Sequence, residues 1–430
     1  MGRRRGAVAR PGPASPPARV RALILALVLA ALAAACSGGG DEASPAGVGG
    51  TDDAAAADAT LVVSTTTTAP PDPGPDPVPA LLASLTVEEK IGQLLMPQLF
   101  GRSGAATGDA AALNESAHGS ASPTDLVTEH HLGGVIYLAD NIATAQQVRA
   151  FSRDLQNAAT GTNGIGLLVA VDQEGGRISR LSDEMSAFPS AADLSGDADQ
   201  VRVASYVTGQ QVQQQGINVV LAPVADVLDP STPSFIDDRS FGDDAEQVAR
   251  MVGAAVDGLQ DAGVAAAVKH WPGHGATPVD SHRLLPSLDI DRELWEQRER
   301  LPFETAIDRD VAIVLVGHLA LPQLDASGAP ATVSSVLIDE LLRRELGFDG
   351  VVMTDALNMG AVGSIPEREL VVDAVLAGVD IVLIPPSLSE ATDALRQAVA
   401  DGTITEARLD ASVTRVLRLK ERLGLLPAAG

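Results

Sequence analysis

Eight short apolar runs organise the sequence from residue 81 onward. Each is separated from the next by enough chain for a helix and two loops, since successive runs start 30 to 52 residues apart. Runs such as Ile381-Val382-Leu383-Ile384 show no polar alternation, as expected of strands buried on both faces. The runs are Gln93–Phe100, Gly133–Leu138, Gly166–Asp172, Asn218–Asp226, Ala265–His270, Ala312–His318, Gly350–Asp355 and Asp380–Pro385. Eight βα units predict an α/β fold, a single (β/α)₈ TIM-like barrel.

Polar residues at the ends of these runs support the barrel over its alternative, a doubly wound open sheet. No Gly-x-Gly-x-x-Gly turn follows any run, so the dinucleotide-binding form of the open sheet lacks its signature. A barrel enzyme builds its active site at the carboxyl ends of its strands. Six titratable residues lie at that end of their runs: Asp172, Asp226, Lys269, His270, His318 and Asp355.

The first 35 residues have the composition of an export signal. A head with six arginines precedes an unbroken apolar run over 22–35, which is too short to span a membrane and suits a signal peptide. Cys36, the only cysteine in the chain, follows small residues and resembles the lipobox of bacterial lipoproteins. The resemblance implies cleavage before Cys36, its lipidation, and a location at the outer face of the cell membrane. Secretion after an ordinary signal peptide is the alternative.

Residues 36–80 form a low-complexity segment that we interpret as a tether, and residues 81–430 as the catalytic domain. The segment is rich in Gly, Ser, Ala, Thr and Pro, a composition that cannot bury enough apolar surface to offset the entropy of ordering. The whole chain carries a formal charge of −26, which argues against a nucleic-acid partner because such partners are bound by clustered Lys and Arg.

The segment 269–282 holds three of the chain's seven histidines. Its Pro and Gly residues exclude a regular helix, so it is predicted to be a loop after a strand. Asp280 and His282 are two residues apart, which in an extended stretch places both side chains on one side. A carboxylate beside an imidazole fixes its tautomer and suits it to act as a general acid and then a base. A zinc site using His270 and His274 with this pair is the alternative, but the usual Glu between two helical histidines is missing, so we expect no metal.

Three further segments add candidate residues. Asp355 follows a buried run and is a candidate nucleophile for an anomeric carbon, or else an N-cap for the next helix. The segment 172–180 includes Asp172 and Arg180, which could bind hydroxyls or a ligand carboxylate. Arg239 lies in an Arg-Ser-Phe-Gly segment that by itself indicates only a loop.

Together these motifs resemble glycoside hydrolase family 3, and within it the β-N-acetylglucosaminidases of the NagZ type. The motifs are Lys-His-x-Pro-Gly-His-Gly with Asp-Ser-His, Asp-Gln-Glu-Gly-Gly-Arg, Arg-Ser-Phe-Gly and Thr-Asp-Ala-Leu-x-Met, and the likeness runs from Leu85 to the C-terminus. The resemblance implies a barrel without the second α/β domain of family-3 glucosidases. Trp271 and Ala276 depart from the common pattern, where Phe and Asp are usual.

The resemblance also assigns roles. Asp355 is expected to be the catalytic nucleophile and His282 the acid/base, with Asp280 as its partner. The positions expected to bind the sugar are Asp172, Arg180, Arg239, Lys269 and His270. The implied reaction is the release of terminal N-acetylglucosamine, with retention and without any cofactor, from a small carbohydrate such as a peptidoglycan fragment, by a monomer. A glycoside phosphorylase, a β-glucosidase and a sugar-binding lipoprotein without activity are the alternatives.

Overall fold

The computed structural model describes residues 76–181 and 188–427. Cys36 and the predicted signal peptide lie outside the described residues, as does most of the predicted tether. The first helix, α2, already covers the last four residues of that tether. Within the described part of the chain, no helix combines the length and the apolar character needed to cross a bilayer.

All eight predicted apolar runs contain a strand, and the strands are parallel. These are β1 (Leu95–Met96), β2 (Gly134–Tyr137), β3 (Leu168–Val171), β6 (Val219–Val220), β7 (Ala265–Trp271), β8 (Ile313–Val316), β9 (Val351–Thr354) and β10 (Val382–Leu383). Six pair in the order β2-β3-β6-β7-β8-β9, and β1 pairs with β10. Parallel bridges Gln98–Ile136 and Met353–Ile381 join the two groups on both sides. The sheet therefore closes into the predicted barrel, and the open-sheet alternative is excluded.

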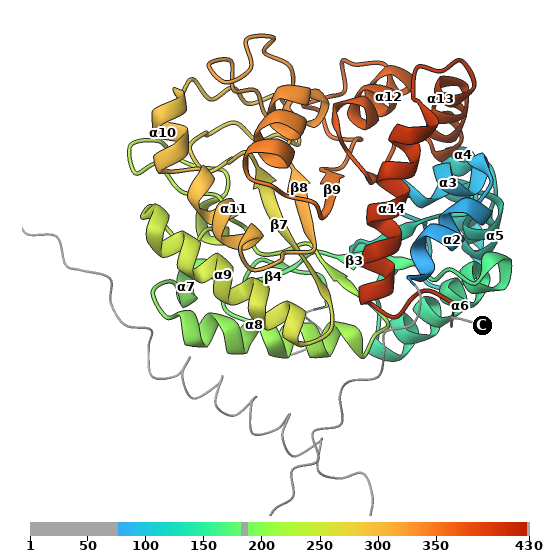
Figure 1. Cartoon of the computed structure of the whole chain (residues 1–430). Helices are drawn as coiled ribbons and strands as arrows, with labels where there is room; N and C mark the ends of the chain where they lie inside the picture. The colour runs from blue at the N-terminus through green and yellow to red at the C-terminus, as the bar shows by residue number, and fades with distance from the viewer. Residues whose placement is uncertain (1–75, 182–187, 428–430) are drawn as a thin grey trace, which may run out of the picture.

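Helices surround this barrel (Figure 1). They are α2 (Pro77–Ser84), α3 (Val87–Gln93), α4 (Gly108–His118), α5 (Pro123–Glu129), α6 (Ala145–Asn163), α7 (Ala191–Leu194), α8 (Ala198–Gln213), α9 (Ala245–Asp261), α10 (Arg292–Gln297), α11 (Arg300–Ile307), α12 (Glu367–Ala377), α13 (Leu388–Ala400) and α14 (Glu406–Arg422). Shorter helical segments are η1 (Ala139–Asn141), η2 (Asp237–Arg239), η3 (Ala331–Val333) and the π-helical η4 (Val336–Glu345). Side-chain caps start many of them; Thr144, for example, accepts a hydrogen bond from the Gln147 amide at the start of α6.

Alternation along each strand divides the core into two layers. In β3, Leu168 and Ala170 belong to a cluster inside the barrel, whereas Val169 and Val171 pack against the surrounding helices. Since both layers are apolar, the strands carry the unbroken hydrophobic runs seen in the sequence. This rigid barrel presents the carboxyl ends of its strands as one face.

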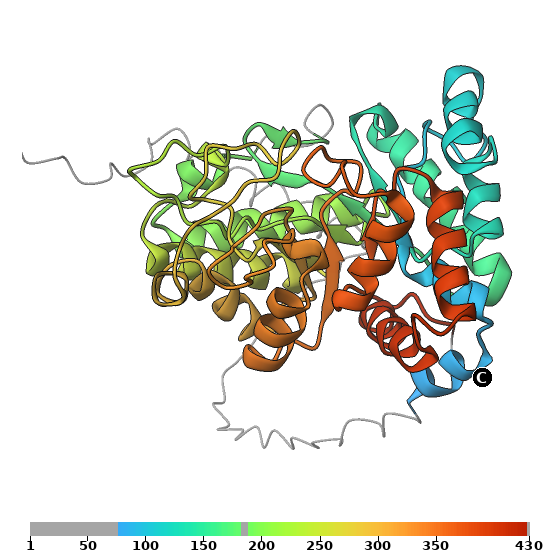
Figure 2. The ribbon, with the colours of Figure 1, turned by 90° about the horizontal axis from the view of Figure 1, so that it is seen from above.

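The described chain begins at the opposite, amino-terminal face of the barrel. Asp76 pairs with Arg418 of α14, with 2.6 Å between Oδ1 and Nη1. Arg418 itself lines a cavity with Ala312 and Gly350, the residues just before β8 and β9. In both views the blue helices α2 and α3 lie beside the red α14 (Figures 1 and 2). The predicted tether therefore joins the barrel on the side away from the strand carboxyl ends.

Candidate active site

A cavity of about 230 Å³ opens at the carboxyl ends of β3, β7 and β9. It is small for a ligand site, and its volume favours a single sugar ring over a polymer groove. Seven of the eight predicted catalytic and sugar-binding residues line it: Asp172, Arg180, Arg239, Lys269, His270, His282 and Asp355. The eighth, Asp280, is bonded to His282.

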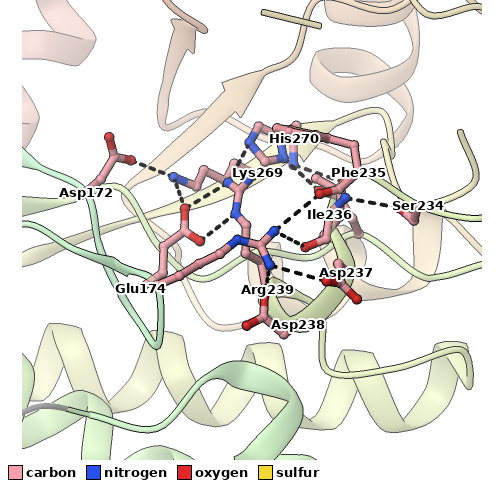
Figure 3. A network of polar contacts seen from close by, with 12 residues as sticks. Asp172, Glu174, Ser234, Phe235, Ile236, Asp237, Asp238, Arg239, Lys269 and His270 are labelled. Atoms are coloured by element: carbon pink, nitrogen blue, oxygen red, sulfur yellow. Dashed lines mark hydrogen bonds and ion pairs between the residues drawn. The ribbon is translucent and has the colours of Figure 1, made fainter. Parts of the chain in front are cut away.

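A buried ion network forms one wall of this cavity (Figure 3). The Lys269 ammonium, only 4% exposed, lies 2.7 Å from Asp172 Oδ1 and 2.7 Å from Glu174 Oε1. Arg239 donates two hydrogen bonds to Glu174, at 2.8 and 2.9 Å. Burial opposes ionisation of Asp172, but the charge and hydrogen bond of Lys269, together with the charges of Arg180 and Arg239, lower the pKa of Asp172. The wall thus presents fixed charges that can bind sugar hydroxyls without reorganising.

His270 is held in one tautomer by Asp226. Its Nδ1 lies 2.6 Å from Asp226 Oδ2, and its backbone N–H donates to Asp226 Oδ1. Burial and the Arg239 charge keep the pKa of His270 well below its usual value, and burial raises the pKa of Asp226 to about 6. At neutral pH a neutral His270 therefore donates from Nδ1 and offers the Nε2 lone pair, which faces Arg239 Nη2 at 3.4 Å.

The predicted pair of Asp280 and His282 forms within a loop. Residues 272–291 contain no regular helix between β7 and α10, as the Pro and Gly residues predict. Asp280 Oδ1 lies 2.8 Å from His282 Nδ1 and also accepts the His282 backbone N–H at 3.0 Å. With Nδ1 bonded, Nε2 is the nitrogen left for proton transfer in the cavity.

Asp355 follows β9 directly and points into the same cavity. The N-cap alternative fails, because the next α-helix, α12, begins only at Glu367 and has Pro366 as its cap. Burial disfavours the charged form, but His318 and His270 nearby and the Ala356 N–H, 2.9 Å away, lower the pKa of Asp355. It is therefore a carboxylate at neutral pH, as a nucleophile must be.

The zinc alternative finds no support in the site geometry. Across residues 76–181 and 188–427, no group of three or more His, Cys, Asp or Glu side chains is arranged to hold a metal ion.

Sequence reasoning gave no catalytic or sugar-binding role to five residues that contribute here. Glu174 completes the ion network, and Asp226 orients His270. Arg177, Phe235 and His274 line the cavity. The sequence does point to Asp226, because this residue ends a predicted strand. It also points to Glu174 and His274, which lie inside the family motifs. It does not point to Phe235, since the place of this residue depends on how distant loops pack.

Comparison with known proteins places this geometry in a family. Residues 86–419 match the model of the glycosyl hydrolase family 3 N-terminal domain. Beta-hexosaminidase A of Pseudoalteromonas piscicida is 32% identical over 79% of this chain and 62% of its own length. Beta-hexosaminidase LpqI of Mycobacterium tuberculosis is 36% identical over 69% of this chain and 77% of its own length.

Solved structures agree. A family 3 β-N-acetylglucosaminidase from Paenibacillus sp. is 40% identical with a TM-score of 0.73, over 81% of this chain and 64% of that one. The M. tuberculosis LpqI structure is 32% identical with a TM-score of 0.69, over 80% of this chain and 96% of that one. The chain spans less than two thirds of the length of its first curated relatives, at 62% and 55%. The family model nevertheless matches most of the sequence, so the chain belongs to glycoside hydrolase family 3.

Proposed function

We propose that this protein is a retaining, exo-acting β-N-acetylglucosaminidase. The observation that carries the proposal is one small cavity lined by both the ionised Asp355 and His282, which is itself bonded to Asp280. Relatives named beta-hexosaminidase and beta-N-acetylglucosaminidase support the choice of sugar.

In the proposed mechanism Asp355 attacks C1 of the sugar while His282 protonates the departing oxygen. The covalent glycosyl-aspartate is then hydrolysed by a water that His282 deprotonates, so the configuration is retained. Asp280 keeps the proton on Nδ1 of His282 and stabilises the imidazolium that forms when Nε2 takes up a proton.

The ion network is proposed to bind the sugar that is released. Asp172 and Lys269 offer an acceptor and a donor to hydroxyls, and Arg239 and the His270 Nε2 offer a donor and an acceptor beside them. Arg180 has a buried Nε without a hydrogen-bond partner among the described residues. A substrate oxygen would satisfy it.

The two central residues can be separated by their leaving-group dependence. Asp355→Ala should lose activity on every N-acetylglucosaminide, on the order of 10³-fold or more. His282→Ala should keep glycosylation by a dinitrophenyl substrate, whose leaving group needs no proton, and lose it on alkyl substrates. The intermediate should accumulate, and azide should restore turnover. Equal losses on both substrates, without an adduct or azide rescue, would contradict this role for His282.

One panel of substrates, assayed with and without phosphate, tests both which sugar is cleaved and whether water or phosphate accepts it. We propose cell-wall fragments that carry terminal N-acetylglucosamine as the natural substrate. Nitrophenyl N-acetylglucosaminide and glucoside distinguish the proposed enzyme from a β-glucosidase. Turnover that requires phosphate and yields a sugar phosphate would indicate a phosphorylase instead, and binding without turnover a sugar-binding protein.

We also propose that the protein is exported and held at the outer face of the membrane by a lipid on Cys36, and that it acts as a monomer. The composition of residues 1–35 and the single cysteine support export and lipidation. Fractionation of cells and light scattering of the purified domain test these proposals.

A further inference from the structure

The His282 ring meets an aromatic side chain from another part of the chain. Phe235, in the segment between β6 and η2, has its ring centroid 5.6 Å from that of His282, with the planes 63° apart. The same ring lies 6.3 Å from the His274 ring, and the Arg239 guanidinium is 6.0 Å from its centroid. Phe235 therefore lies between the ion network and the loop that carries the catalytic pair.

Arg177 fixes the backbone on which Phe235 sits. Its Nη2 donates to the carbonyl oxygens of Phe235 and Ile236, at 3.3 and 3.1 Å, and its Nη1 pairs with Asp237 and Asp238. Figure 3 shows this segment beside Arg239 and His270. The Phe235 N–H also points to the Thr277 carbonyl oxygen at 3.4 Å, which links the segment to the 272–291 loop. The backbone that carries the Phe235 ring is thus held by contacts from outside its own loop.

The His282 ring is held much less firmly than its backbone. The His282 carbonyl oxygen accepts the Gly360 N–H at 2.9 Å, and the Ser281 carbonyl oxygen accepts the Ala361 N–H at 3.1 Å. The side chain is 60% exposed, and among the described residues its hydrogen bonds go to Asp280 alone. One bond at Nδ1 fixes the tautomer but leaves the ring free to tilt about it. An edge-to-face contact removes that freedom.

We propose that Phe235 is a positioning residue that holds the His282 imidazole at the tilt needed for proton transfer. The inference rests on the proposed function and refines it. In an edge-to-face pair the positive edge of one ring meets the negative face of the other, so the contact favours one relative orientation of the two rings. Proton transfer requires His282 Nε2 within hydrogen-bond reach of the leaving oxygen. An imidazole that samples many tilts spends less time in that position.

Replacing the aromatic ring should therefore affect the steps that use His282 more than the others. Phe235→Leu keeps an apolar side chain and should lower kcat on alkyl N-acetylglucosaminides about 3- to 10-fold, as expected for one aromatic pair. Glycosylation by the dinitrophenyl substrate should change less than about 2-fold, because its leaving group needs no proton. Phe235→Tyr keeps the ring and should restore the alkyl rate. Tyr206→Leu, a half-exposed aromatic on α8, is the matched control and should leave both rates unchanged.

Equal losses on both substrates would show that Phe235 serves general stability, and an unchanged alkyl rate would show that it does not position His282. Either result overturns the proposal. If Arg177 acts through Phe235, the double variant Arg177→Met with Phe235→Leu should lose less alkyl-substrate activity than the product of the two single-variant losses.

The contact itself can be tested without activity. With seven histidines in the chain, ring C–H signals can be assigned by NMR, that of His282 by its loss in His282→Gln. Phe235→Leu should move the His282 signals toward those of an exposed histidine, and Tyr206→Leu should not. A wild-type protein inactive on all N-acetylglucosaminides would refute the proposed function. Unmoved His282 signals in Phe235→Leu would refute the positioning contact, whatever the activity.

Discussion

Replacing the buried Lys420 by methionine should stabilise the protein, although it removes a charge and a hydrogen bond. Lys420 lies in α14 with no exposed surface. Its ammonium donates to Gln93 Oε1 at 2.6 Å, and no ion pair among the described residues includes it. Burial lowers the pKa of Lys420 from 10.5 to about 7. The fold therefore carries a buried ammonium, or a deprotonated amine, at a cost in stability.

The size of the gain follows from linkage. A fall in pKa from 10.5 to about 7 costs about 5 kcal/mol at pH 7, at about 1.4 kcal/mol per unit. Lys420→Met also leaves Gln93 Oε1 without its donor, which costs about 1–3 kcal/mol. The free energy of unfolding at pH 7 should therefore rise by about 2–4 kcal/mol.

The change of the stability difference with pH distinguishes this explanation from others. Between pH 7 and 10.5 the unfolded chain holds the Lys420 proton and the folded chain has lost it, so the wild type gains stability as the pH rises. Urea unfolding at pH 7 and 9.5 should show the advantage of the variant shrinking. Lys90→Met, which removes an ammonium paired with Asp410, is the control and should not stabilise. A less stable Lys420→Met variant, or an advantage that does not change with pH, would refute the reasoning.

Three further predictions concern single groups. In Asp226→Asn the amide should donate a hydrogen bond to His270 Nδ1, so the proton of the His270 ring should move to Nε2. The variant should therefore have a kcat about 10- to 100-fold lower. An unchanged rate in steady-state assays would contradict this. Asp380→Ala should lower the free energy of unfolding by about 3–5 kcal/mol, because Arg343 loses its buried partner; a loss below about 1 kcal/mol in urea titrations would contradict it. Cys36→Ser should release the protein from membranes without changing its activity, and equal retention after fractionation would argue against lipidation.

The barrel was predictable because burial on both faces leaves a direct mark in the sequence. All eight apolar runs contain a strand, but β1, β6 and β10 pair over only two residues each. The pattern reports burial of side chains and not the pairing of backbone groups, so it overestimates strand length. The small hairpin of β4 (Gln173–Gly175) and β5 (Ile178–Ser179) was not predicted, because its residues fall within a motif that also indicates a tight turn.

The candidate site was predictable where chemistry sits at strand ends or in motifs. Asp355, Lys269 and Asp172 meet at one cavity because parallel strands bring their carboxyl ends together. His318, also at a strand end, lies buried and bonded to the Ala356 carbonyl oxygen and to Thr332. Contacts between loops, such as Phe235 with His282, depend on tertiary packing between segments 47 residues apart and leave no local pattern.

The ion pair of Asp76 with Arg418 shows where the predicted tether meets the barrel. It lies on the amino-terminal face of the barrel, and the cavity lies on the carboxyl face. If Cys36 is anchored as we propose, the tether meets the barrel on the face opposite the cavity and does not have to cross the mouth of the site. Residues 36–75 can span at most about 140 Å when fully extended. The domain would then reach sugar ends throughout a layer of that depth above the membrane.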